Sequence, residues 1–442
     1  MSDEGREPGP LDRALRLFGD VRAGEGATVL LMCVNVALLL IAYYVLKTVR
    51  EPLILMAGGA ELKTYASAAQ AFTLVFYVPL YGWAAQQMPR QRFLAAVILF
   101  FVACIQIFFV GSRMGVPNLG FVFFVWVGIF SLTTIAQFWS YANEIYSRPE
   151  GDRLFPLIAI GSTAGAPIGA ALASWLFTTG LGPFLMMQVA AVLLLVHLGL
   201  YRLTNQRVSA GPARAPQAAM KPGNGFALVF QSRYLGLVAL LLVLLNLVNT
   251  VGEFILSKAV VATADARLAV DPAFNKEAYL GTFYGGYSFW TSVAAILLQA
   301  FVTSRLVKRF GLGGVVFAMP IVALGVYGLA AAGAGLAALR WLKTAENSTD
   351  YSVMNTAKQM IWLPTSPAEK YKAKQAIDTF FVRAGDVLAA GVVLLGTHWL
   401  SLGVAGFARA NILIVAAAIG VGVLLLREYR RLTAPASAGA SA

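Results

Sequence analysis

The stretch from residue 346 to residue 391 contains the side chains of this sequence that are best suited to chemistry. It places ten charged residues within a sequence that is otherwise apolar enough for a membrane interior. Ionisable residues at bilayer depth are costly, and they persist where they face water or one another. The stretch therefore predicts a polar cavity through the membrane, suited to the binding and passage of a polar solute.

Charged and polar side chains recur at spacings of three and four residues, which places them on one face of a helix. The four faces comprise Tyr43, Lys47, Arg50 and Glu51; Asn246, Asn249, Glu253 and Ser257; Lys343, Glu346, Asn347, Asp350, Met354 and Lys358; and Thr379, Arg383 and Asp386, with Asp378 beside them. Four such faces avoid lipid by converging on a shared cavity. Structural ion pairs within a face, and charges that reach the membrane surface from span ends, are the open alternative.

Cations on these faces exceed what a neutral solute requires. Arginine forks two hydrogen bonds onto phosphate oxygens, lysine supplies a compact charge, and aromatic rings stack on a planar base. We therefore expect an anionic, phosphate-bearing substrate. Its predicted ligands are Lys47, Arg50, Asn143, Lys343, Tyr351, Lys358 and Arg383. The residues predicted to act in coupling or gating are Glu51, Glu144, Glu253, Glu346, Asp378 and Asp386.

The composition indicates which elements must position these residues. Of the 442 residues, 59% are hydrophobic and only 12% are charged, and the mean hydropathy is +0.72. Soluble domains have about 25% charged residues. Apolar runs of about 20 residues suit helices that cross a bilayer, so we predict an all-α integral membrane protein with twelve transmembrane helices. The predicted spans are 27–48, 63–85, 93–112, 118–145, 154–178, 182–203, 234–257, 279–303, 312–333, 335–361, 375–398 and 405–426.

The predicted spans divide six and six at a linker, 204–233, that is rich in alanine, proline, glycine and basic residues. The six-helix bundles then cover 27–203 and 234–427. Residues 1–26 are expected to form a cytoplasmic segment, either an amphipathic helix on the membrane surface or a solvated tail, and 428–442 a cytoplasmic tail. The net charge is +13, and the basic residues cluster in alternate loops. This distribution predicts a protein of the cell membrane with both termini in the cytoplasm, and it argues against a nucleic-acid partner.

The two halves echo each other. A charged, proline-containing turn leads into the next span at RPEGDR (148–153) and again at SPAEKYKAK (366–374). Two parallel repeats of six spans, with substrate between them, are the arrangement of major-facilitator transporters. In the fifth span, a run of glycine and alanine from Gly161 to Ala171 predicts close approach of a neighbouring helix.

Three segments carry a family resemblance: YYVLKTVREPLIL (43–55), FWSYANEIYS (138–147), and the run from Tyr351 through KYKAKQAID to Arg383. They resemble motifs of the nucleotide transporter family, the ATP/ADP translocases of plastids and obligate intracellular bacteria. The resemblance implies that Arg50 stands at the basic position of span one, Glu253 at the acidic position of span seven, and Lys358 at the basic position of span ten. The family uses these charges for nucleotide transport.

The chain departs from the family pattern at two places. Trp126 and Val127 occupy the region of span four in which translocases carry an acidic residue, and Gln359 stands where many members have glutamate. These departures bear on strict ATP/ADP exchange more than on the fold.

The sequence therefore predicts a secondary transporter, expected to be monomeric, that carries a nucleotide by alternating access. One alternative is transport of another organic anion, coupled to protons that titrate Glu144, Glu253, Glu346 or Asp378. Another is a non-transporting membrane subunit or receptor whose polar face binds a partner helix. Enzymatic activity, cofactors and metals are not expected, because the sequence contains no nucleophile–base pair, metal-ligand cluster or Walker motif.

Overall fold

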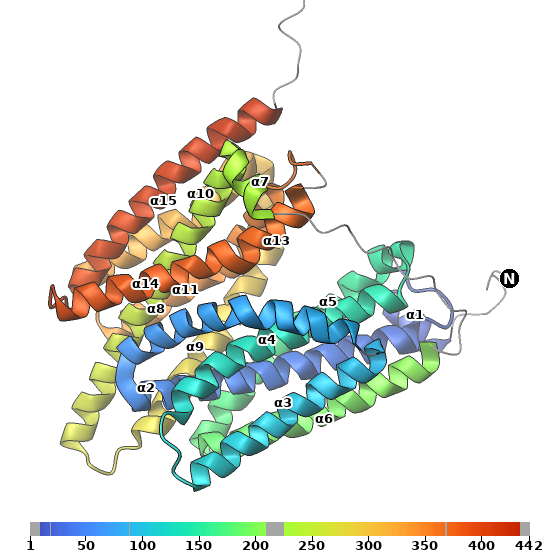
Figure 1. The fold of residues 1–442 in the computed structure, drawn as a ribbon, viewed down its shortest axis with the longest axis horizontal. Helices are drawn as coiled ribbons and strands as arrows, with labels where there is room; N and C mark the ends of the chain where they lie inside the picture. Colours follow the sequence, from blue (N-terminus) through green and yellow to red (C-terminus); the bar gives the residue numbers. More distant parts are fainter. Residues whose placement is uncertain (1–8, 18, 88, 209–224, 367–368, 434–442) are drawn as a thin grey trace, which may run out of the picture. The chain divides into compact units, whose positions relative to one another are not determined.

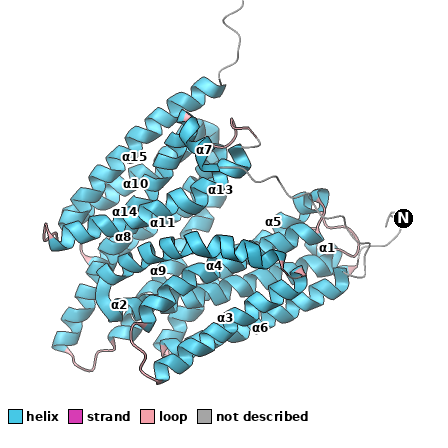
Figure 2. Ribbon diagram, viewed as in Figure 1, coloured by secondary structure: helices cyan, strands magenta, loops and turns pink. Residues whose placement is uncertain are grey.

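The computed structural model describes residues 9–17, 19–87, 89–208, 225–366 and 369–433, and no strand occurs within these ranges (Figures 1 and 2). The helices are α1 (Pro10–Leu15), α2 (Gly26–Gln86), α3 (Arg90–Arg113), α4 (Leu119–Ile145), α5 (Arg148–Thr178), α6 (Pro183–Val208), α7 (Gly225–Gln231), α8 (Arg233–Val270), α9 (Lys276–Leu298), α10 (Ser304–Ala331), α11 (Leu336–Thr349), α12 (Asn355–Met360), α13 (Lys374–Ala376), α14 (Val382–His398) and α15 (Val404–Thr433). The π-helical turns are η1 (Gln299–Thr303), η2 (Asp350–Met354), η3 (Glu369–Ala373) and η4 (Ile377–Phe381).

Nine helical segments of the described chain are long and apolar enough to cross a membrane. Two of them are much longer than the roughly 20 residues that one crossing needs: α2 has 61 residues, and the continuous segment Lys276–Ala331 has 56. The predicted tenth span, 335–361, is not among the nine, because its charged side chains lower its hydropathy. The predicted all-α membrane class is confirmed.

Glycines interrupt both long helical segments. In α2 the backbone leaves helical geometry at Gly58 and Gly59, and Gly59 has a φ of +66°. Gly311 in α10 has a φ of +58°. Side chains other than hydrogen rarely tolerate this left-handed region. Both interruptions fall between predicted spans, within 48–63 and 303–312, so each long segment contains a place at which the chain can change direction.

By its internal contacts the chain divides into two units. Unit 1 comprises Met1–Ala57, Phe76–Ala218 and Asn275–Phe289, and unit 2 comprises Gly58–Val75, Ala219–Phe274 and Trp290–Ala442. These units follow the predicted halves except at 58–75 and 275–289, each of which groups with the other half. In unit 1, α3 packs along α6; in unit 2, α8 is central and packs against α11, α14 and α15 (Figure 1).

The segments predicted to flank the bundles contain short helices. In the N-terminal segment, helix α1 covers only Pro10–Leu15, and the Asp12 carboxylate accepts hydrogen bonds from the amides of Gly9, Gly24 and Gly26 at 2.9–3.0 Å. The predicted linker includes the end of α6 and all of α7, while its residues 209–224 lie outside the described chain. Helix α15 extends to Thr433, into the predicted tail.

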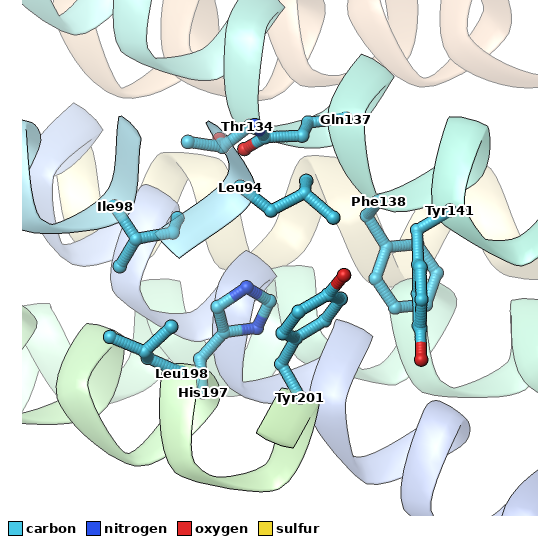
Figure 3. Close-up of a pocket in the computed structure, with 9 residues that line it drawn as sticks. All are labelled: Leu94, Ile98, Thr134, Gln137, Phe138, Tyr141, His197, Leu198 and Tyr201. Carbon is cyan, nitrogen blue, oxygen red and sulfur yellow. The ribbon is translucent and has the colours of Figure 1, made fainter. Parts of the chain in front are cut away.

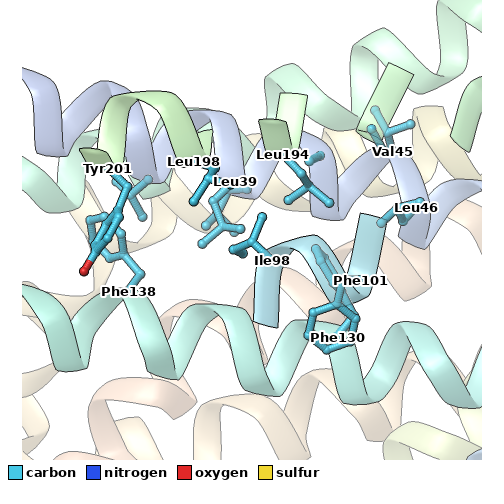
Figure 4. Close-up of a cluster of buried hydrophobic side chains, with 14 of the residues drawn as sticks. Leu39, Val45, Leu46, Ile98, Phe101, Phe130, Phe138, Leu194, Leu198 and Tyr201 are labelled. Atoms are coloured by element: carbon cyan, nitrogen blue, oxygen red, sulfur yellow. The ribbon is translucent and has the colours of Figure 1, made fainter. Parts of the chain in front are cut away.

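The core of unit 1 is apolar and rich in aromatic residues (Figure 4). Phe101 of α3 meets Phe130 of α4 edge to face, with ring centroids 5.1 Å apart. Trp126 stacks on Phe130 and on Phe123 at 5.6 and 5.5 Å. Trp126 lies in the region of span four where the translocases carry an acidic residue, and in this chain it packs among aromatic rings.

The glycine-rich fifth span packs closely on the first. A Cβ atom placed on three of its glycines would lie only 2.1–2.7 Å from a backbone carbonyl oxygen of α2. The pairs are Gly161 with Cys33, Gly165 with Ala37, and Gly169 with Ile41. Each step of four residues on α5 matches a step of four on α2, so the glycines form one contact ridge. The predicted close approach is confirmed.

The echo between the halves extends to hydrogen bonding. At the start of α5, the amide and hydroxyl of Ser147 both donate to the Glu150 carboxylate at 2.6 Å. Before η3, the amide and hydroxyl of Ser366 donate to Glu369 at 2.8 and 2.7 Å. A Ser-x-x-Glu arrangement satisfies exposed groups where a helix begins. Corresponding helical segments in the two units therefore begin with the same hydrogen-bond arrangement.

Candidate functional site

A buried ion pair occupies the interior of unit 2. The Lys343 ammonium lies 3.1 Å from Glu346, and their side chains are 3% and 0% exposed. Lys343 also donates to the side-chain oxygen of Asn249 at 2.8 Å. The Tyr327 hydroxyl of α10 donates to the Glu346 carboxylate, 2.7 Å away. Lys343 was a predicted substrate ligand and Glu346 a predicted gating residue. Here they pair with each other on α11 and bind side chains of two neighbouring helices, α8 and α10.

Glycine makes room for this cluster. A Cβ atom on Gly252 of α8 would lie 1.9 Å from the Tyr327 hydroxyl and 2.8 Å from the Lys343 ammonium. Any larger residue would therefore push both groups away from α8. The position lies one helical turn from Asn249, so the same stretch of α8 supplies both the space and a hydrogen-bond acceptor.

A second ion pair in unit 2 joins residues that are far apart in sequence. Lys63 of α2 lies 3.5 Å from the Glu253 carboxylate and donates to the Ser257 hydroxyl at 3.1 Å. Asn347 donates to the other oxygen of Glu253 at 2.9 Å. Beside this pair, Lys258 of α8 lies 3.1 Å from Glu61. Segment 58–75 is thus tied to α8 by two ion pairs of opposite polarity.

A third polar group connects α8 with α14. The Asp386 carboxylate accepts hydrogen bonds from Asn246 at 2.9 Å and Thr250 at 2.8 Å, and Arg383 lies 3.3 Å from its other oxygen. The backbones approach closely here, because a Cβ on Gly385 would lie 2.7 Å from the Val243 carbonyl oxygen. Asp386 is buried, whereas the Arg383 side chain is 36% exposed. The arrangement holds a guanidinium in place while leaving part of it accessible.

Lys358 is held in a similar way. Its ammonium lies 3.1 Å from Asp350, and its side chain is 35% exposed. Asp350 begins the π-helical turn η2, and such turns are rare and frequent at functional sites. A cavity of about 40 Å³ adjoins this pair. Its lining comprises Leu242, Leu245, Asn246, Asn249, Asp350, Lys358 and Val382.

Unit 1 holds the remaining predicted cations. Arg50 of α2 lies 3.1 Å from Glu51, and its guanidinium sits 4.3 Å from the centroid of the Phe124 ring. The Lys47 ammonium lies 5.0 Å from the Tyr44 ring. Helix α4 approaches α2 closely at Gly120, where a Cβ would lie 2.5 Å from the Leu53 carbonyl oxygen. This approach brings Phe124, one turn further along α4, over Arg50.

The other predicted site residues are exposed. Asn143 and Glu144 lie on the surface near the end of α4, and Tyr351 is exposed in η2. Asp378 of η4 is also exposed and lies 3.9 Å from Lys374. The described residues thus place Lys343, Glu346 and Glu253 in one polar region of unit 2, and leave these four outside its ion pairs.

Five side chains of the unit 2 site were not predicted: Glu61, Lys63, Thr250, Lys258 and Tyr327. Lys63 is the first residue of the predicted span 63–85, Tyr327 lies in an apolar run, and Thr250 adjoins Asn249. Lys63 could have been identified from the sequence, because a charged side chain at the boundary of a membrane span requires a partner. Tyr327 and Thr250 offered none, because hydroxyl-bearing side chains are common in membrane helices.

The model of a family described as TLC ATP/ADP transporter matches residues 121–333. The family resemblance is confirmed. ADP,ATP carrier protein 1 of Chlamydia trachomatis is 24% identical over 56% of this chain and 53% of the carrier. The protein of the same name from Rickettsia bellii is 22% identical over 84% of this chain and 86% of the carrier. The chain spans about half the length of the Chlamydia carriers that it matches.

Solved transporter structures share the fold. The nucleoside transporter NupG superposes with a TM-score of 0.65 at 13% identity, covering 91% of this chain and 99% of NupG. A peptide transporter, POT, in complex with sulfate superposes with a TM-score of 0.66 at 12% identity, covering 95% of this chain and 98% of POT. At such low identity the likeness concerns the fold alone. The chain is therefore a multi-pass membrane protein with a transporter fold.

Proposed function

We propose that this protein is a secondary transporter that exchanges or takes up nucleotides by alternating access. Similarity to ADP,ATP carriers supports the substrate class. We further propose twelve transmembrane helices in two six-helix bundles, in the major-facilitator arrangement, because each long helical segment contains a glycine interruption between two predicted spans. The proposal includes a monomer in the cell membrane with both termini in the cytoplasm and no enzymatic activity.

The observation that carries the proposal is a pair of partly exposed cations in unit 2, each held by an aspartate. The side chains of Lys358 and Arg383 are 35% and 36% exposed, whereas that of Lys343 is 3% exposed. A phosphate group can compete with Asp350 for Lys358 and with Asp386 for Arg383, through charge-assisted hydrogen bonds. We therefore assign Lys358 and Arg383 to substrate, with Arg50 and Lys47 of unit 1, and Lys343 to structure.

The Lys63–Glu253 pair provides a basis for coupling. A carboxylate close to a polyanion repels it, so Glu253 suits a contact that forms in one access state more than contact with substrate. An ion pair that exists in only one of two states biases the equilibrium between them. The Glu61–Lys258 pair lies next to it, with nitrogen and oxygen 3.1 Å apart.

Uptake of labelled ATP tests the function directly. Cells that express the protein should accumulate labelled ATP, and unlabelled ADP should compete. Absence of uptake by a correctly inserted protein would exclude nucleotide transport and favour another organic anion. If ATP is taken up but ADP neither competes for uptake nor exchanges against ATP, the activity is one-way uptake. That outcome would agree with the apolar surroundings of Trp126, in the region where translocases carry an acidic residue.

Cysteine labelling tests the topology. A cysteine placed at Ser209 should resist a membrane-impermeant reagent outside intact cells, and one placed at Thr179 should react. The opposite pattern would invert the proposed orientation.

A further inference from the structure

Unit 1 contains a cavity that the charged groups do not line. Its volume is about 410 Å³, within the roughly 300–1,000 Å³ typical of small-molecule sites. Residues of α2, α3 and α4 line it, and the cavity is open on one side, where Ala136 and Ser140 are exposed. Its lining comprises Tyr81, Ala85, Phe93, Leu94, Ala136, Gln137 and Ser140. A smaller space of about 10 Å³ adjoins it, and Leu94 and Gln137 line both (Figure 3).

The lining of both spaces is aromatic and neutral among the residues that the structure describes. The rings of Tyr81 and Phe93 lie 5.2 Å apart in the larger cavity. Tyr141 and Tyr201 lie 4.4 Å apart beside the smaller space. Figure 3 shows Leu94 between Gln137 on one side and His197 and Tyr201 on the other. Such walls suit a planar, uncharged group and disfavour a phosphate.

Gln137 is a polar group that lines both spaces and that the described part of the chain leaves unsatisfied. The residue is only 6% exposed, and its side-chain nitrogen has no hydrogen-bond partner within the described part of the chain. Two neighbouring polar side chains are engaged: Thr134 donates to the Phe130 carbonyl at 2.8 Å, and a ring nitrogen of His197 lies 3.2 Å from the Asn35 carbonyl oxygen. The Tyr141 hydroxyl, beside the smaller space, has no hydrogen-bond partner within the described chain. A buried amide without a partner costs free energy unless a ligand or water completes it.

We propose that this cavity binds the nucleobase of the transported nucleotide, an inference that rests on the proposed function. The base stacks against the rings of Tyr81 and Phe93, as bases stack on aromatic side chains in other proteins. The Gln137 carboxamide then supplies both a donor and an acceptor to the base edge, the pairing that glutamine makes with adenine. Neutral aromatic groups of unit 1 then select the base, and this cavity leaves the phosphates to cationic side chains outside its lining.

Equilibrium binding to the purified full-length protein in nanodiscs tests this assignment. In Gln137→Leu, ADP should bind roughly tenfold or more weakly, because a bidentate contact to a base is lost. Inorganic tripolyphosphate, which has no base, should bind as it does to the parent. The preference among ATP, GTP, CTP and UTP should also diminish. Gln106→Leu is the matched control, because this glutamine of α3 pairs with Gln188 at 2.8 Å and does not line either space.

A photolabel on the unmutated protein removes the concern that the variant misfolds. An azido-adenine nucleotide should crosslink to peptides that contain 81–94 or 134–141, and excess ADP should suppress the reaction. Crosslinks confined to other peptides would overturn the proposal, as would unchanged ADP affinity and base preference in Gln137→Leu; both results would leave nucleotide transport intact. If the parent binds tripolyphosphate and nucleotides equally, the base site fails. If it binds neither, the proposed function fails as well.

Discussion

The two units hold their helices together by different chemistry. Unit 1 is built from interlocked aromatic rings around Trp126 and from a glycine ridge on which two backbones touch. Unit 2 buries the ion pair Lys343–Glu346 at its centre. In an apolar core, the stability lost on substitution scales with the volume removed. A buried charge depends instead on one particular partner, and loss of that partner leaves the charge uncompensated. We therefore expect a single substitution in the buried ion pair of unit 2 to lower the free energy of unfolding more than a single substitution in the apolar core of unit 1.

Removal of one charge from the buried pair should have the largest effect. Glu346→Gln leaves the Lys343 ammonium without its carboxylate and should destabilise the protein by about 3–5 kcal/mol. Denaturant unfolding in detergent measures this loss. Glu61→Gln is the matched control: its pair with Lys258 leaves both side chains 30% exposed, so the cost should be at most about 1 kcal/mol. Equal losses in the two variants would remove the distinction between buried and exposed pairs.

The double variant Lys343→Met, Glu346→Leu sharpens this test. It removes both charges at once, and apolar replacement of a whole buried pair is often neutral. Tyr327 then retains the Val248 carbonyl oxygen, 3.4 Å away, as an acceptor. Most of the stability lost in Glu346→Gln should return. Failure to recover would indicate that packing around these side chains, and not charge, holds unit 2 together.

Substrate binding should respond to single cations from either unit. Arg50→Ala and Lys358→Ala should each weaken nucleotide binding roughly tenfold or more, because loss of a charge-assisted hydrogen bond costs about 1.5–3 kcal/mol. Adenosine lacks phosphates, so its binding should scarcely change. Lys343→Met serves as the contrast and should not lower the affinity of the protein that remains folded. Normal binding by both alanine variants would contradict the phosphate assignment.

Unit 1 should be sensitive to added volume. Gly161→Ala places a methyl group 2.1 Å from the Cys33 carbonyl oxygen, and overpacking of this kind costs about 1–3 kcal/mol. A lowered melting temperature in detergent would register the cost. At Gly199 of α6 an added Cβ meets no atom within 4 Å, so Gly199→Ala should be neutral or stabilising by up to about 1 kcal/mol. Similar melting temperatures for the two variants would refute the glycine ridge.

The coupling role of Glu253 predicts a separation of flux from affinity. Glu253→Gln and Lys63→Met should each slow transport roughly fivefold, as expected for loss of a partly buried pair worth about 1 kcal/mol. Nucleotide affinity should stay within a few-fold of the parent. Liposome flux and equilibrium binding on the same preparation decide the matter. Unchanged flux removes the coupling role, whereas lost binding would place Glu253 in the substrate site.

The smallest effect should come from the N-terminal segment of unit 1. The backbone amides of Gly24, Gly26 and Gly9 lower the pKa of Asp12 below its ordinary value of 3.8. A lowered pKa in the folded state means that the ionised carboxylate stabilises the fold above that value, and that this contribution is lost as pH falls through the folded pKa. Asp12→Asn should therefore melt lower than the parent at pH 7, and the difference should shrink towards pH 3. A difference independent of pH would exclude the charge as its cause.

Local patterns in the sequence predicted much of the fold. Apolar length predicted the helices, and the spacing of Gly161, Gly165 and Gly169 predicted the close contact of α5, because both properties depend on residues within a few helical turns. The spacing of Lys343 and Glu346 likewise placed them on one face. It did not indicate whether that face meets water or protein, and the structure buries both residues. The predicted substrate ligand therefore becomes a structural residue in our proposal.

The tertiary structure alone decided which charges meet. Lys63 pairs with Glu253 and Tyr327 with Glu346, and Gln137 is left without a partner beside an aromatic cavity. Helical periodicity relates residues within one helix, but a contact between helices depends on which neighbours pack together and at what rotation. Sequence by itself determined a membrane-embedded helical protein whose helices have charged faces. Packing determined which of those charges are buried in ion pairs and which stay partly exposed.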